Sequence, residues 1–139
     1  MRGMQHKPLV SWALGTSCLC LAVAAQASPR LQCQVTYAGE TVTVQAQPVQ
    51  DPYPVAAVDI RGRFRFKPVV VGTAERVERV LIYVYAESRP HPVLVQQARY
   101  LPPFVRTDPA RPLTGLQRVY AGPLERELIY SCDWQEDPR

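Results

Sequence analysis

Four basic residues recur at every second position of the segment Arg61-Gly62-Arg63-Phe64-Arg65-Phe66-Lys67. Side chains two positions apart share one face of an extended strand, so the pattern predicts a row of cations formed by Arg61, Arg63, Arg65 and Lys67. The alternation places Phe64 and Phe66 on the opposite face, toward the core. A row of cations attracts anions. The segment therefore predicts a contact site for a lipid phosphate, an acidic glycan or an acidic protein.

A second interpretation of this row is structural. Opposite charges on neighbouring strands stabilise a sheet, and the carboxylates available for such pairing are Glu75, Glu78, Glu125 and Glu127. Gly62 is the uncertain point of the pattern, because a bulge there would turn Arg61 to the other face. The sequence leaves open whether the row binds a partner or is neutralised within the protein.

A proline-rich segment, Leu101 to Pro112, supplies a second candidate contact surface. Its four prolines favour a stiff loop, and such loops often carry recognition residues. Tyr100 and Phe104 are the candidate contact residues. The alternative is that the segment only crosses between two sheets, with Phe104 packed against the core.

Catalytic chemistry has few candidates after residue 27. His91 is the single histidine there and lies between two prolines, an arrangement typical of a solvated turn. Ser88 is near it in sequence but lies in an Arg-Pro turn. Glu125 and Glu127 could in principle hydrolyse a glycosidic bond, yet an i, i+2 pair on an outer face is typical of a solvated edge. No catalytic residue is assigned.

Cysteine and histidine content also limits metal and redox chemistry. Cys33 and Cys132 are the two cysteines outside the first 27 residues, and an even pair in an exported chain predicts one disulfide. Redox pairs usually lie close in sequence, and these two do not. One histidine, two cysteines and no methionine in this part of the chain predict no metal site and no cofactor.

The first 27 residues predict export. Arg2 and Lys7 precede an apolar run from Leu9 to Ala25, and Ala25-Gln26-Ala27 is a small-x-small cleavage pattern. These are the three parts of a secretory signal peptide, which predicts cleavage after Ala27. The expected result is a periplasmic or secreted single domain, residues 28–139, with no transmembrane span.

Two alternatives to a cleaved signal peptide are a membrane anchor and a lipoprotein signal. The apolar run is short for a spanning helix and contains polar residues. A lipoprotein signal needs a large aliphatic residue three positions before the cysteine and a small one directly before it. Cys18 follows Gly15 and Ser17, and Cys20 follows Ser17 and Leu19, so neither satisfies both requirements.

Period-two alternation dominates the remaining chain and predicts about seven or eight short strands. The expected strands are Leu31–Tyr37, Thr41–Ala46, Val55–Ile60 continuing through Arg63–Lys67, Val69–Val71, Val77–Ala86, Val93–Tyr100, Leu116–Tyr120 and Glu127–Trp134. Pro68 marks an edge or a break. The apolar run at Val80 to Tyr85 predicts a central strand covered on both faces. The predicted fold is an all-β, two-sheet sandwich of immunoglobulin-like architecture, with a small barrel as the alternative.

Charge and composition restrict the function class. Arg2 and Lys7 belong to the leader, so the chain after residue 27 has 14 basic and 12 acidic residues. This excess of positive charge is too small for a nucleic-acid binder. Thirteen of the 14 are arginine, a bias typical of a GC-rich bacterium. The sequence favours a non-enzymatic binding or accessory module of the bacterial periplasm or cell envelope, with a protein or an anionic envelope ligand as partner. The alternatives are a surface-appendage or envelope-assembly subunit completed by a partner's strand, and a small hydrolase using carboxylates.

Overall fold

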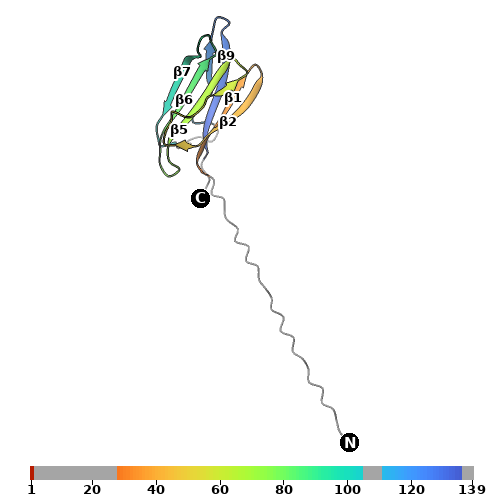
Figure 1. Ribbon diagram of the computed structural model, residues 1–139, viewed down its shortest axis with the longest axis vertical. Coiled ribbons are helices and arrows are strands. Elements are labelled where there is room, and N and C mark those ends of the chain that lie inside the picture. The colour runs from red at the N-terminus through yellow and green to blue at the C-terminus, as the bar shows by residue number, and fades with distance from the viewer. Residues whose placement is uncertain (2–27, 105–110, 136–139) are drawn as a thin grey trace.

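Two sheets, antiparallel except for one short parallel pair, face each other in this protein. The structure is a computed structural model and describes residue 1, residues 28–104 and residues 111–135. Within these ranges the secondary structure consists of nine strands and contains no helix. Figure 1 shows the strands of both sheets running along the long axis of the domain. The strands divide between two sheets, so the predicted sandwich is confirmed and the barrel alternative is wrong.

The first sheet joins the two ends of the described domain. Its order is β2 (Glu40–Ala46), β1 (Arg30–Tyr37), β9 (Arg126–Gln135) and β8 (Gln117–Ala121). The first long strand and the last, orange and blue in Figure 1, lie side by side and antiparallel. Cys33 is directly opposite Cys132 in this register, and the two form a disulfide with Cα atoms 4.0 Å apart. The predicted pairing of first strand to last is confirmed.

The second sheet consists of β5 (Phe64–Gly72), β6 (Val77–Ala86) and β7 (Val93–Tyr100), with two short strands beyond β5. One is β3 (Pro48–Val49), which pairs in parallel with β5. The other is β4 (Val58–Ile60), which pairs with it antiparallel. β6 therefore lies inside the sheet, as its apolar run predicts. β7 is an edge strand.

Pro68 does not break its strand but lies at a local edge, the first of the two positions that the sequence predicts for it. β5 continues through it from Phe64 to Gly72, and Pro68 is opposite Ile82 of β6. On the other side, β4 pairs only as far as Phe66 and β3 begins only at Val70. A proline has no N–H to contribute to a ladder. It is tolerated here because it lies where β5 lacks a second neighbour.

The core fills the space between the sheets with alternate side chains of each strand. The first sheet contributes Leu31, Val35, Leu128 and Tyr130 to the core. The second sheet contributes Phe64, Phe66, Val80, Ile82 and Val84. The buried positions of Phe64 and Phe66 are those the alternation predicts. A smaller apolar cluster of Val69, Val71 and Leu81 lies on the outer side of the second sheet, packed against Val49 and Val55. The segment from β3 to β4 thus covers one part of that outer face.

Candidate functional site

The four cations of the predicted row do not lie on one strand. Arg61, Gly62 and Arg63 form a turn between β4 and β5, where Arg61 and Gly62 both have positive φ, 55° and 62°. The Arg63 N–H donates to the Ile60 carbonyl across this turn, and the Gly62 N–H donates to the Asp59 carboxylate. Glycine readily adopts such a backbone conformation. The expected continuous or bulged strand is therefore wrong, and β5 carries only Arg65 and Lys67.

Two of the four cations are paired with carboxylates. Arg61 forms an ion pair with Glu40 at the start of β2, and Arg65 forms one with Glu87 after β6. The hydrogen bond from Arg65 to Glu87 raises the pKa of the guanidinium, as does that from Arg61 to Glu40. The pairing expected from the sequence is wrong, because the carboxylates that neutralise the row are Glu40 and Glu87. Glu127 pairs instead with Arg118, and Glu78 pairs with Arg79.

Lys67 belongs to a group of polar and aromatic side chains on the outer side of the second sheet. It is opposite Tyr83 on β6, and Tyr83 is opposite Gln97 on β7. The neighbouring row runs from Arg65 to Tyr85 to Leu94. Arg99 lies one row further along β7, opposite Leu81. We call this set the tyrosine face: Arg65, Lys67, Tyr83, Tyr85, Leu94, Gln97 and Arg99.

The tyrosine face is open and positively charged. Arg65, Leu94, Gln97 and Arg99 are exposed, while Lys67 and the two tyrosines are half-buried. The ring centroids of Tyr83 and Tyr85 are 6.4 Å apart, with an angle of 23° between the rings. None of the seven residues of the tyrosine face is acidic; the nearest carboxylates of β6, Glu78 in the strand and Glu87 after it, pair with Arg79 and Arg65. Among the described residues, neither Lys67 nor Arg99 has an ion-pair partner.

The alternation of cations predicts Arg65 and Lys67 on this face but gives no sign of the residues beside them. The run from Val80 to Tyr85 was expected to be covered on both faces, and that expectation is wrong for Tyr83 and Tyr85. Tyrosine has an apolar ring and a polar tip, so it fits a half-exposed position as well as a core edge. Two tyrosines at i, i+2 in this run were the signal for an open outer face.

The second predicted contact pair, Tyr100 and Phe104, packs against the core. Both side chains are partly buried against the main cluster, and the Phe104 ring lies 5.1 Å from that of Trp134 between centroids. This packing matches the interpretation in which Phe104 anchors a crossover. Residues 105–110 of the loop lie outside the described ranges. A contact role for Tyr100 and Phe104 stays a prediction.

The described residues offer little geometry for catalysis. His91 is exposed in the segment between β6 and β7, and no described residue forms a hydrogen bond with its ring. Glu125 lies in the β8–β9 turn, so it does not share a strand face with Glu127. No cluster of three or more His, Cys, Asp or Glu side chains that could hold a metal ion occurs in residues 28–104 and 111–135.

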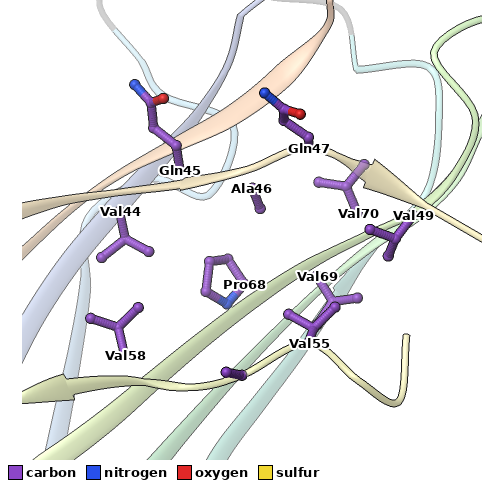
Figure 2. Close-up of a pocket in the computed structure, with 11 residues that line it drawn as sticks. Val44, Gln45, Ala46, Gln47, Val49, Val55, Val58, Pro68, Val69 and Val70 are labelled. Carbon is purple, nitrogen blue, oxygen red and sulfur yellow. The ribbon is translucent and has the colours of Figure 1, made fainter. Parts of the chain in front are cut away.

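An apolar hollow of about 200 Å³ lies beside Pro68, where β5 lacks a second neighbour. Figure 2 shows Val44, Val55 and Val58 around Pro68, whereas the amide groups of Gln45 and Gln47 point away from it. The hollow therefore lies between the edge strand of the first sheet and the segment that leads from β3 to β4. Its lining fits an apolar group of small size.

Comparison of the chain with known protein families, with curated proteins and with solved structures finds no match. No helix among the described residues is long and apolar enough to cross a membrane.

Proposed function

We propose that this protein is a non-enzymatic binding module of the bacterial cell envelope and that the tyrosine face contacts its anionic partner. The observation that carries the proposal is a pair of cations, Lys67 on β5 and Arg99 on β7, that flank β6 and have no ion-pair partner within the part of the chain that the structure describes. Protein surfaces of near-balanced charge usually intersperse both signs. None of the seven residues of the tyrosine face is acidic, and two of its three cations have no ion-pair partner among the described residues, so this face attracts anions.

The paired arginines contribute less to this attraction. Glu40 and Glu87 partly neutralise Arg61 and Arg65, while Lys67 and Arg99 keep their full field. Arg63 is exposed and unpaired among the described residues, but it lies in the turn at the end of the sheet. We therefore assign Lys67 and Arg99 the main role and Arg63 a peripheral one.

Export belongs to the same proposal. The leader pattern of the first 27 residues supports secretion, although those from residue 2 onward lie outside the described ranges. The buried Cys33–Cys132 disulfide suits an oxidising compartment. Mass spectrometry of exported protein should find a chain that begins at Ser28. An intact N-terminus in the membrane fraction, or a lipid on Cys18, would contradict this part of the proposal.

The binding proposal is tested with a soluble polyanion as probe. Wild-type protein should be retained on a heparin column and elute with salt, because exposed charges are screened as ionic strength rises. Lys67→Ser with Arg99→Ser should elute at clearly lower salt. The matched control, Arg76→Ser with Arg126→Ser, removes the same charge elsewhere and should elute close to the wild type. Equal elution of the two double variants would overturn the assignment of the site.

A second candidate function is supported by the hollow beside Pro68. Strand donation requires a sheet edge with unpaired backbone and an apolar groove, and β5 has both between Phe66 and Val70. A subunit that awaits a donated strand would be unstable or self-associated when purified alone. A purified protein that is monomeric and unfolds cooperatively would exclude this second function and leave the first unaffected.

A further inference from the structure

We propose that the anionic partner of the tyrosine face is the surface of a lipid bilayer that contains acidic phospholipids. This inference rests on the proposed function and narrows it to one kind of partner. Three features of the face carry it: exposed aliphatic side chains, half-buried tyrosines and cations spread across a sheet surface.

The aliphatic side chains lie at the start of the edge strand β7. Leu94 and Val95 are 46% and 36% exposed, whereas Val93, opposite the core-packed Ala86, belongs to the inward side of the strand. Leu94 is opposite Tyr85, so it adjoins the tyrosine pair directly. The register shift between Val84 and Tyr85 places Val95 in a bulge beside it. The face therefore combines its charge with an apolar margin.

The tyrosines occupy the middle of the face. Tyr83 packs its ring against the outer cluster of Val69, Val71 and Leu81 while part of its side chain remains exposed. Tyrosine is enriched where a lipid hydrocarbon region meets water, because its ring is apolar and its hydroxyl is polar. Two such rings next to Leu94 match that environment.

The cations are distributed over the face and do not line the apolar hollow. Lys67 and Arg99 are on the first and third of three adjacent strands and one row apart, which places their Cα atoms roughly 12 Å from each other. Two cations separated by this distance suit separate headgroups of a lipid layer. A long lysine or arginine stem can also lie on apolar surface with its charge at the headgroups.

The aliphatic margin distinguishes a bilayer from a soluble acidic polysaccharide. Both ligands would pair with the cations, but the hydroxyl-rich surface of a polysaccharide gains little from contact with Leu94 and Val95. At a bilayer, apolar burial and attraction to anionic headgroups act together. The surface is therefore expected to bind anionic vesicles reversibly, without insertion of a helix.

The test uses co-sedimentation of the exported protein with vesicles. Wild-type protein should bind vesicles of phosphatidylglycerol and phosphatidylethanolamine, and bind vesicles of phosphatidylcholine alone far less. Each basic residue near an anionic surface changes the binding constant about fivefold. Lys67→Ser with Arg99→Ser should thus weaken binding by about thirtyfold, and Arg76→Ser with Arg126→Ser should weaken it much less.

A single aliphatic variant separates the bilayer from other anionic partners. Leu94→Ser should weaken binding to vesicles several-fold and leave retention on heparin unchanged. Leu116→Ser is the control, because Leu116 is 63% exposed and precedes β8 of the other sheet. Both residues are exposed, so the urea midpoint of each variant should stay near that of the wild type.

The outcomes distinguish this inference from the proposed function. Heparin retention that depends on Lys67 and Arg99, without binding to anionic vesicles, would exclude a bilayer as the partner. The proposal that the tyrosine face contacts an anionic partner would still stand. If the double variant binds both vesicles and heparin as tightly as the wild type does, the inference and the proposed function are both wrong. Equal effects of Leu94→Ser and Leu116→Ser on vesicle binding would exclude the tyrosine face as the membrane contact.

Discussion

The hydroxyl oxygen of Thr114 accepts a hydrogen bond from the backbone N–H of Cys132 at 2.8 Å. The Thr114 N–H in turn donates to the Cys132 carbonyl at 3.1 Å, and the hydroxyl donates to the Gly115 carbonyl at 2.8 Å. Thr114 is 6% exposed, a polar residue buried beside the disulfide. It fixes the segment before β8 to the last strand.

Thr114→Val should lower the free energy of unfolding by about 1–3 kcal/mol, because the variant leaves the buried Cys132 N–H without its acceptor. Urea denaturation measures the change. Thr43→Val is the control, since the Thr43 hydroxyl donates to Gln34 in an exposed pair and its loss should cost about 0.5 kcal/mol or less. Equal stability of Thr114→Val and wild type would contradict the assigned role.

The disulfide should account for a large part of the stability. Cys33 and Cys132 are fully buried and 99 residues apart in sequence. Cys33→Ala with Cys132→Ala should lower the free energy of unfolding by about 2–5 kcal/mol. Alkylation of denatured, unreduced protein should label neither cysteine. Labelling of both would show that the disulfide does not form. The variant that still folds should keep its retention on heparin, because the tyrosine face lies on the other sheet.

The Tyr130 hydroxyl is buried, and no described residue forms a hydrogen bond with it. Its ring packs against Phe66 with centroids 5.1 Å apart. Tyr130→Phe keeps this packing and removes the unsatisfied group, so the variant should be as stable as the wild type or more stable by about 1 kcal/mol. Loss of more than 1 kcal/mol in urea denaturation would reveal a partner for the hydroxyl.

The dependence of stability on alkaline pH is an independent test of the burial of the Tyr130 hydroxyl. Burial raises the pKa of Tyr130 well above its ordinary value, and burial also raises that of Tyr100. Below pH 10 both the folded and the unfolded chain hold these protons, so stability does not change on their account. Above pH 10 an unfolded tyrosine ionises while buried Tyr130 stays protonated, and stability falls by about 1.4 kcal/mol per pH unit. Tyr130→Phe should show a shallower decline between pH 10 and pH 11.

Strands that bury one face were predictable from the sequence, and the short or irregular ones were not. Leu31, Cys33 and Val35 alternate with polar residues, and β1 follows this pattern. The Arg61–Arg63 turn was missed because Ile60 and Phe64 keep the period of two across it. β3 was missed because it begins at Pro48 and is two residues long.

The candidate site was predictable only in part, because part of it depends on the register between strands. Arg65 and Lys67 are neighbours in sequence, so their shared face follows from the geometry of a strand. Gln97 and Arg99 join them only through the register of β7 against β6. That register shifts at a bulge next to Tyr85, a position that the sequence does not mark.

The most direct test of the tyrosine face as a binding surface is an NMR titration of the isotope-labelled protein with heparin fragments. We expect amide shifts to change mainly in the Arg65–Val69 and Leu81–Tyr85 segments and in Leu94–Arg99, with those of the first sheet unchanged. Shifts concentrated in β1, β2, β8 and β9, or around the hollow beside Pro68, would contradict it.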